Sequence, residues 1–372
     1  MLSRVLRGLL LLPLAVLTTG CSAVLLHPSG DVALQQRNLI LVSTVLMLLI
    51  IVPVMVLTAL FAWRYRQSNT KADYQPEWAH STGLELVIWS APLLIIIALG
   101  AVTWIATHTL DPYRPVARLS AAQPLPEGVK PLRVQVVALD WKWLFIYPDY
   151  GIATVNEMAA PVDVPIEFQI TASSVMNSFF VPALAGQIYA MPAMETQLHA
   201  VINKPGTYEG FSANYSGAGL SDMHFRFLGM KQADFAQWLE TVKSGGGTLA
   251  RADYQALEKP SEREPVRRYA SVAPDLYDAI LNLCVDRNKM CLRDMMKIDA
   301  KGGLGMAGVY NVGRLAYDKP RARGNDDVPQ PGLAYVLALC ASDPGRLWSP
   351  PPPTALPAAP GSDLAASATA AR

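Results

Sequence analysis

Two long apolar segments stand out in the first third of the chain. Residues 39–63 contain no charged side chain, and residues 84–107 contain only Glu85 near their start. A helix of about 20 apolar residues crosses the hydrocarbon core of a bilayer. Prolines are tolerated in such helices where neighbouring helices pack against them, so Pro53 and Pro92 do not argue against this assignment. The pattern predicts two transmembrane helices that form a hairpin.

The polar segment between the two spans, residues 64–83, sets the expected orientation. Arg64, Arg66 and Lys71 lie close to the end of the first span. Loops rich in Lys and Arg stay in the cytoplasm, which places both outer ends of the hairpin on the opposite side. Residues 108–131, rich in Pro and Ala, are expected to form a linker out of the membrane.

The hydrophobic period changes to two at residue 132, which predicts β-strands. Apolar and polar residues alternate along residues 132–138, 166–171 and 198–202, with Pro and Gly turns between them. Several short alternating strands indicate a β-sandwich, expected over residues 132–229. The same period puts Trp141 and Trp143 on one face and leaves His199 and His224 on the polar phase, where we expect solvated or interface side chains.

The start of the chain has the pattern of a secretory signal. Arg4 and Arg7 precede an apolar run, and small residues lead to Cys21. The Gly20–Cys21 junction is typical of a lipoprotein cleavage site, so we expect residues 1–20 to be removed and residues 21–38 to form a lipidated N-terminal segment. The alternative is an uncleaved or ordinarily cleaved leader with a buried Cys21.

Beyond the sandwich, the pattern predicts a helical extension and a tail. Helical spacing of apolar residues in 231–243 and 265–287 places a small helical extension at residues 230–320. Residues 321–372, rich in Pro, Ala, Gly and Ser, are expected to be disordered. Cys284 and Cys291 are too far apart for a disulfide on one continuous helix, but a break near Asn288 in an oxidising compartment would allow it.

The helix and strand patterns together predict a membrane-anchored all-β protein, and the composition supports a membrane protein rather than a soluble enzyme. Of 372 residues, 51 % are hydrophobic and only 16 % are charged, with a formal net charge of +1. No basic run suggests a nucleic-acid partner. Four cysteines are too few for a disulfide scaffold. The commonest nucleotide-binding and metalloprotease motifs are missing.

The segment 205–227 has the spacing of a metal-binding loop but lacks metal ligands. Ser212, Ser216, Leu220 and Met223 follow the pattern S-x3-S-x3-L-x2-M, and Asn177 begins the NSFF segment upstream. A dinuclear copper centre needs thiolates and imidazoles. Serine hydroxyls do not ionise near neutral pH, leucine has no donor atom, and a methionine on a strand is usually core filler. We therefore expect no metal here.

These segments resemble the cupredoxin domain of subunit II of the haem-copper oxidases. In the cytochrome c oxidases of that family the loop reads C-x3-C-x3-H-x2-M, and a histidine begins the upstream segment. Here Ser212, Ser216, Leu220 and Asn177 replace the ligands, and only Met223 is kept. The sequence around the loop is similar to subunit II of the bo-type quinol oxidases, the branch that keeps the fold and has lost the copper site.

The resemblance implies a subunit of a respiratory ubiquinol oxidase in a bacterial inner membrane, with its C-terminal domain in the periplasm. The complex would oxidise ubiquinol, reduce oxygen to water and move protons. Subunit I would hold the haems, one copper and the quinol site. This chain would bind no redox cofactor and take part in no catalytic step, and its partners would be subunit I, other small oxidase subunits and membrane lipid.

Glu85 has two interpretations that the sequence leaves open. Thr82 to Glu85 fits a capping box, in which the glutamate reaches back to the amide of the N-cap residue. In the family, a glutamate in the matching H-S-x-x-L-E-x-x-W context lies at the mouth of a proton pathway into subunit I. A carboxylate at the edge of a span is a functional candidate by default.

Two alternatives to the quinol oxidase subunit remain at this stage. A cytochrome c oxidase subunit II would need a thiolate pair in the sandwich, but Cys284, Cys291 and Cys340 all lie after it. A membrane-tethered lipoprotein that acts as a binding or assembly module would instead exist without a large haem-bearing partner.

Overall fold

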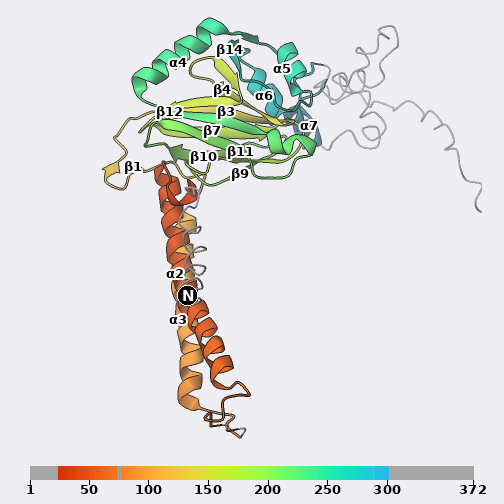
Figure 1. Ribbon diagram of the computed structural model, residues 1–372. Coiled ribbons are helices and arrows are strands. Elements are labelled where there is room, and N and C mark those ends of the chain that lie inside the picture. Colours follow the sequence, from red (N-terminus) through yellow and green to blue (C-terminus); the bar gives the residue numbers. More distant parts are fainter. Residues whose placement is uncertain (1–23, 74, 76, 288, 301–372) are drawn as a thin grey trace, which may run out of the picture. The chain divides into compact units, whose positions relative to one another are not determined.

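The computed structural model describes residues 24–73, 75, 77–287 and 289–300 (Figure 1). The expected signal sequence, Cys21, Cys340 and the tail at 321–372 lie outside the described residues. The chain divides into two compact units, residues 1–286 and residues 287–372. The first unit contains the hairpin and the sandwich, and the described part of the second contains one short helix, α7 (Leu292–Asp299).

Two long apolar helices open the first unit, as the pattern predicts. After a short 3-10 turn, η1 (Val24–Leu26), helix α2 spans Asp31–Arg64, and helix α3 spans Thr82–Thr109. Both are long and apolar enough to cross a membrane, and their most apolar windows are unburied within the chain. The hydroxyls of Thr58, Thr103 and Thr107 each donate to the carbonyl four residues earlier, which satisfies these polar groups within the helix.

The β-sandwich consists of a seven-stranded and a five-stranded sheet. The first has the order β10-β7-β3-β4-β5-β14-β13, in which only the β3–β7 and β13–β14 pairs are parallel. Its strands are β3 (Leu132–Leu139), β4 (Lys142–Tyr147), β5 (Ile152–Val155), β7 (Pro165–Ala172), β10 (Thr196–Val201), β13 (Gly247–Leu249) and β14 (Arg267–Val272).

The second sheet carries the loop with the unusual serines. Its order is β6-β12-β11-β8-β9, and only β6–β12 is parallel. The strands are β6 (Glu157–Pro161), β8 (Asn177–Phe180), β9 (Ile188–Ala190), β11 (Gly206–Ser212) and β12 (His224–Met230), with the 3-10 turn η2 (Ala218–Asp222) before β12. Strands β1 (Arg118–Ser120) and β2 (Gln123–Pro124) pair within the linker.

An aromatic core fills the space between the sheets. The alternating apolar residues of β3 and β7 are fully buried there, as the period of two predicts. Phe179 of β8 stacks on Phe225 of β12 with ring centroids 5.5 Å apart, and Trp143 of β4 meets both rings edge-on. Stacked and edge-to-face pairs of this kind add to the stabilisation from burial alone. The fold class expected from the sequence, two apolar helices followed by a β-sandwich, is confirmed.

The C-terminal extension contains strands as well as helices. Helices α4 (Gln232–Gly245), α5 (Arg251–Glu258) and α6 (Leu276–Leu281) follow β12. The expectation of a helix over residues 265–287 is wrong for its first part, because Arg267–Val272 forms β14 and pairs with β5 and β13. An open strand edge supplies backbone partners that override a weak helical pattern. Cys284 and Cys291 are both disulfide-bonded.

The first turn of α2 is attached directly to the sandwich. The amides of Ser29 and Gly30 donate to the carbonyl of Ala183, each at 2.9 Å. The Asp31 carboxylate is buried and accepts hydrogen bonds from Arg118 and Gln35, both at 2.8 Å. A buried carboxylate is stable only with such partners. These contacts fix the position of the sandwich relative to the start of α2.

Candidate functional site

The structure brings together four of the five residues that the loop pattern singled out, Asn177, Ser212, Ser216 and Met223. The Ser212 hydroxyl donates to the Asn177 side-chain oxygen at 3.0 Å and accepts a hydrogen bond from the amide of Ser178 at 3.3 Å. The Ser216 hydroxyl lies 4.0 Å from the Met223 sulfur. Leu220 lies in η2, where its amide donates to the Gly217 carbonyl and its carbonyl accepts the Met223 amide. The residues that share this spacing in the sequence therefore lie close together in the structure.

This cluster is held by hydrogen bonds between neutral groups. Asn177, Ser212 and Met223 are all buried. The Asn214 side chain donates to the Met176 carbonyl at 3.2 Å, which joins the loop to the segment before β8. Buried polar groups that satisfy one another in this way stabilise a single loop conformation. The donor atoms available are hydroxyls, amides and one thioether.

Trp141 lies against the loop. It occupies the turn between β3 and β4 with φ 64°, and its ring packs close to Gly219 of the loop between β11 and β12. The buried Trp143 ring packs against Phe179 and Phe225 of the same sheet. The Trp141 indole nitrogen donates to the Ser216 carbonyl at 3.1 Å. A Cβ at Gly219 would lie 2.4 Å from the Trp141 ring, so only glycine allows this approach. Both rings therefore face the second sheet, as the strand period predicts.

The described residues contain no group of three or more His, Cys, Asp or Glu side chains that could hold a metal ion. Among them, the two histidines of the sandwich have other contacts. His224 is half exposed and lies 2.9 Å from the Glu209 carboxylate, as expected for the polar phase. His199 is half-buried, and desolvation lowers its pKa, partly offset by Glu167.

Glu85 does not close a capping box. Helix α3 begins at Thr82 with Ser81 as its N-cap, so Glu85 lies one residue beyond the position from which it could reach back. Its carboxylate instead lies 2.6 Å from the His80 ring nitrogen Nδ1. Both side chains remain accessible, at 44 % exposure for Glu85 and 68 % for His80. The capping interpretation is therefore wrong, and the carboxylate has an ionisable partner.

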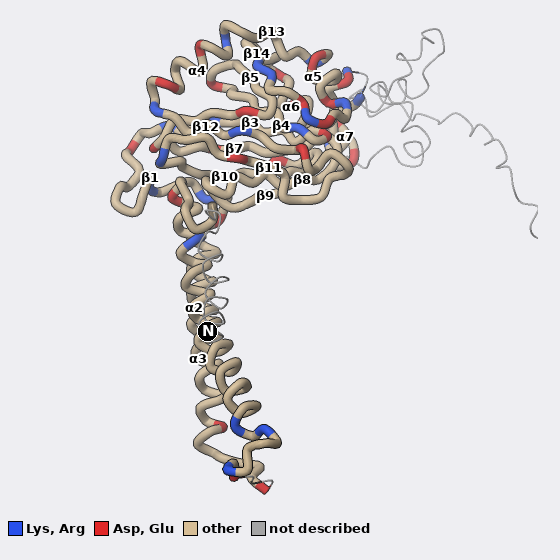
Figure 2. The backbone as a smooth tube through the Cα atoms, in the orientation of Figure 1, with Lys and Arg blue, Asp and Glu red and all other residues tan. Residues whose placement is uncertain are grey.

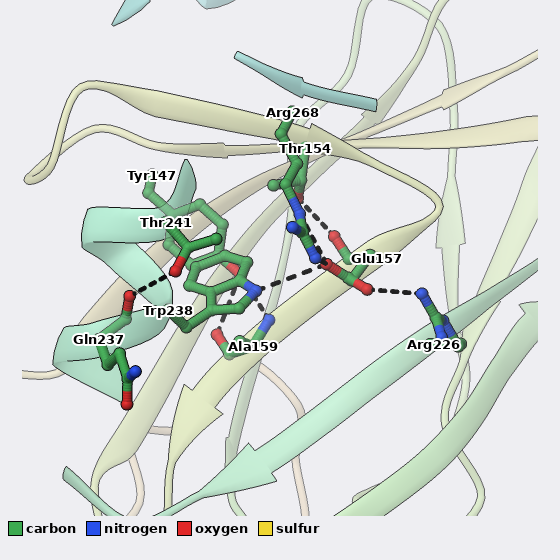
Figure 3. A network of polar contacts seen from close by, with 9 residues as sticks. All are labelled: Tyr147, Thr154, Glu157, Ala159, Arg226, Gln237, Trp238, Thr241 and Arg268. Atoms are coloured by element: carbon green, nitrogen blue, oxygen red, sulfur yellow. Dashed lines mark hydrogen bonds and ion pairs between the residues drawn. The ribbon is translucent and has the colours of Figure 1, made fainter. Parts of the chain in front are cut away.

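Glu157, which no sequence pattern singled out, is the centre of a buried ionic network (Figure 3). Glu157 of β6 contacts Arg226 of β12 at 2.8 Å and Arg268 of β14 at 2.6 Å, and it accepts a longer bond from Trp238 of α4. In the sequence, Glu157 is only a single charged residue at the start of an apolar strand, which is a weak signal. The network ties the extension to both sheets.

Lys142 makes a second buried connection to the extension. Its ammonium group donates to the Lys259 carbonyl at 2.8 Å and to the Ser261 hydroxyl at 2.7 Å. Desolvation lowers the pKa of Lys142, and the carboxylates of Glu264 and Asp140 oppose this shift. A nearly fully buried lysine is rare without such partners, so this contact specifies where the segment after α5 must lie.

Comparisons with known proteins identify relatives for most of the chain. Residues 150–227 match the family described as cytochrome c oxidase subunit II, periplasmic domain, and residues 243–288 match the COX aromatic rich motif. The chain is 50 % identical to the cytochrome bo(3) ubiquinol oxidase subunit 2 of Pseudomonas putida over 267 residues, which cover 72 % of this chain and 82 % of that protein. It is 49 % identical to the ubiquinol oxidase subunit 2 of Acetobacter aceti, over 72 % of this chain and 84 % of that protein.

One solved structure with sequence similarity is the periplasmic domain of subunit II of cytochrome oxidase (CoxB) of Bradyrhizobium japonicum. It is 26 % identical, covers 30 % of this chain and 94 % of that chain, and gives a TM-score of 0.30.

Proposed function

The chain belongs to the ubiquinol oxidase subunit 2 family, and from this premise we propose that it anchors and caps the haem-bearing subunit of a quinol oxidase without binding copper itself. The observation that supports this proposal is the donor set at residues 177, 212, 216, 220 and 223. Apart from the Met223 thioether, these positions carry hydroxyl, amide and hydrocarbon side chains in place of the thiolates and imidazoles that a copper pair requires. An electron acceptor for a soluble cytochrome would be missing from this domain.

The proposed absence of copper has a direct test. The whole complex is purified, and its copper is counted against its haem. We expect only the copper of subunit I and no mixed-valence dicopper signal in electron paramagnetic resonance. Such a signal, or a near-infrared band from the isolated chain, would refute the proposal. In addition, chelator treatment should leave the unfolding temperature of the chain unchanged, because no bound metal would stabilise it.

The partners and the membrane position follow from the same family assignment. We propose that α2 and α3 pack along subunit I in the bacterial inner membrane, with residues 64–83 in the cytoplasm and the sandwich in the periplasm. Basic residues at the end of α2 support this orientation. We also propose removal of residues 1–20 and lipidation of Cys21. Mass spectrometry of the mature N-terminus tests this, and an unmodified Cys21 or an intact Met1 would contradict it.

We further propose that Glu85 admits protons to the complex, with His80 as its partner. Glu85 lies in the first turn of α3, at the expected cytoplasmic edge of the membrane, and its carboxylate remains accessible. A histidine at hydrogen-bond distance can pass a proton to or from a carboxylate.

The role of Glu85 is tested by turnover and proton uptake of the Glu85→Gln complex. We expect both rates to fall by about a hundredfold, the lower end of the range for loss of a positioned proton-transfer group. Glu127→Gln, an exposed glutamate in the linker, is the matched control and should leave both rates unchanged. If Glu85→Gln behaves like that control, the carboxylate has no role in proton entry.

One alternative loses support from the cysteines, and the other has a direct test. A cytochrome c oxidase subunit II would need free thiolates, but Cys284 and Cys291 are disulfide-bonded and lie after the loop. A free lipoprotein module would purify alone. Copurification with a large haem-bearing subunit distinguishes that module from an oxidase subunit.

A further inference from the structure

An open pocket of about 250 Å³ lies where the two apolar helices meet the sandwich. It is lined by the first turns of α2, the end of α3, residues 110–118 of the linker, the segment before β9 and strand β10. All of these walls come from this chain, so the pocket does not depend on a partner for its shape.

Hydrogen bonds hold the walls of this pocket together. The His199 amide of β10 donates to the Pro112 carbonyl of the linker at 3.1 Å. The Arg118 guanidinium of β1 donates to the buried Asp31 carboxylate of α2 at 2.8 Å. These bonds tie the linker to both the sandwich and the first helix. The pocket is therefore preformed, as sites for small molecules usually are.

The pocket lies at the depth of the lipid headgroups when the hairpin spans a bilayer. Gln35, which lines the pocket, precedes the start of the apolar run at Leu39 by four residues, or about 6 Å along a helix. The headgroup layer is about 5 to 8 Å thick on each side of the hydrocarbon core. Figure 2 shows the helices uncharged along their middle, with a basic position again close to the sandwich.

Two acidic and two basic side chains line the pocket. Asp31 and Arg118 neutralise each other as an ion pair. Arg114 and Asp111 are exposed and form no ion pair with any described residue. One guanidinium nitrogen of Arg114 donates to the His108 carbonyl at 3.0 Å, and the Asp111 carboxylate accepts one backbone amide at 2.9 Å. The pocket therefore presents one positive and one negative charge that its own walls do not neutralise.

The lining suits a zwitterion with an apolar part. A guanidinium binds phosphate oxygens through parallel hydrogen bonds, and a carboxylate accepts hydrogen bonds from an ammonium group. Both groups occur together in the headgroup of phosphatidylethanolamine. Val32, Leu110 and Val116 add apolar lining, and the most apolar parts of the adjoining helices are unburied within the chain. Acyl chains can follow these surfaces, whereas a free phosphate ion gains nothing from them.

We propose that this pocket binds the headgroup of a zwitterionic phospholipid of the periplasmic leaflet, with its phosphate on Arg114 and its ammonium group on Asp111. The inference rests on the proposed position of the hairpin in the membrane and adds a ligand that the proposed function does not include. The bound lipid fills the junction between the helices and the sandwich and joins the sandwich to the bilayer surface.

Photocrosslinking in the purified complex tests this site. The complex is depleted of lipid and given a phosphatidylethanolamine with a photoreactive group beside its headgroup, and labelled peptides are identified by mass spectrometry. We expect label within residues 109–118. Arg114→Gln should lower this labelling about tenfold, the loss expected when a charge-assisted hydrogen bond is removed. Arg37→Gln is the matched control, because it removes the same charge from the same end of α2 outside the pocket lining.

A competition arm uses the wild-type complex and separates a lipid headgroup from a free phosphate. Unlabelled phosphatidylethanolamine should displace the label, whereas millimolar inorganic phosphate should not. Phosphatidylglycerol, which has the phosphate but no ammonium group, should compete about tenfold less well, because it makes no charge-assisted bond to Asp111. Asp111→Asn should remove this preference.

Each contrary result identifies what is wrong. A wild-type complex without label in residues 109–118 overturns the lipid site, and so does equal labelling of the Arg114→Gln and Arg37→Gln complexes. Displacement by inorganic phosphate shows a phosphate site and overturns the lipid as its ligand. A chain that purifies without a haem-bearing subunit instead refutes the proposed function, and labelling of that isolated chain in phosphatidylethanolamine vesicles still decides the lipid site.

Discussion

At the level of single residues, the cluster of Asn177, Ser212, Ser216 and Met223 is stabilised by contacts between neutral side chains. Ser212 bonds to Asn177, and the Trp141 indole covers the loop through the Ser216 carbonyl. The sequence alone shows that thiolate and imidazole donors are absent from these positions, because residue type determines which atoms are available. It could not predict that Trp141 would cover the loop, since that contact depends on a turn conformation and on Gly219 from a distant segment.

Glu157→Gln should destabilise the chain by about 2 kcal/mol, because Arg226 and Arg268 lose a buried counter-charge but can partly regain water. The measurement is the thermal unfolding of the full chain in detergent. Glu209→Gln is the matched control, since Glu209 is exposed and its contact to His224 is at the surface. Equal unfolding temperatures for the two variants would mean that the network contributes little.

The half-buried position of His199 predicts that the free energy of unfolding depends on pH. Burial lowers its pKa in the folded chain, so the unfolded chain binds the proton more readily near the ordinary pKa of about 6.5. Stability should therefore fall as the pH drops below that value and become constant below the folded pKa. Unfolding curves between pH 7.5 and pH 5 should show a smaller loss for His199→Gln than for the wild type. An identical pH profile for both would contradict the assignment.

At the level of elements, the attachment of α2 depends on a close backbone approach. A Cβ at Gly30 would lie 2.6 Å from both the Leu184 and Val201 carbonyl oxygens. Strand β14 also depends on a neighbouring segment. Its residues form a strand because they pair with the open edge of β5. The hydrophobic period and the residue propensities predicted both membrane helices and the core strands, because their burial pattern is local. They did not predict elements whose partners lie far away in sequence.

Gly30→Ala should separate the sandwich from the start of α2. The added methyl group forces the backbone apart, at a cost of about 3 kcal/mol, the upper end for overpacking. Hydrogen exchange of the Ala33 amide, which bonds to the Leu184 carbonyl, should accelerate. Gly83→Ala in α3 has open space around it and serves as the control. Unchanged exchange in Gly30→Ala would show that the attachment is not tight.

At the level of the whole molecule, the C-terminal extension is part of the sandwich sheet. Strands β13 and β14 complete the seven-stranded sheet, and Arg268 and Ser261 satisfy the buried charges of Glu157 and Lys142. An expected helical extension thus contributes to the core of the domain that precedes it. The boundary at residue 230 does not separate two independent structures in the first unit.

Truncation after residue 245 should therefore unfold or aggregate the chain. It exposes the edge of β5 and leaves Lys142 without its acceptors in the extension, both of which are costly. Truncation after residue 300 is the control and should leave the unfolding temperature within about 2 °C of the full chain, the shift for a small change in stability. If both truncations unfold alike, the extension does not stabilise the sandwich in the way proposed.

The sequence by itself determined the membrane spans, the alternating core of the sandwich, the absence of thiolate and imidazole donors at the loop and the family. Each of these depends on the type and local spacing of residues, which are written in the chain. The tertiary structure alone decided the partner of Glu85, the position of Trp141, the strand at Arg267–Val272 and the network of Glu157. These features depend on which distant segments become neighbours in the fold. A buried charge needs a counter-charge and an open strand edge needs a pairing strand, and both partners come from distant parts of the sequence.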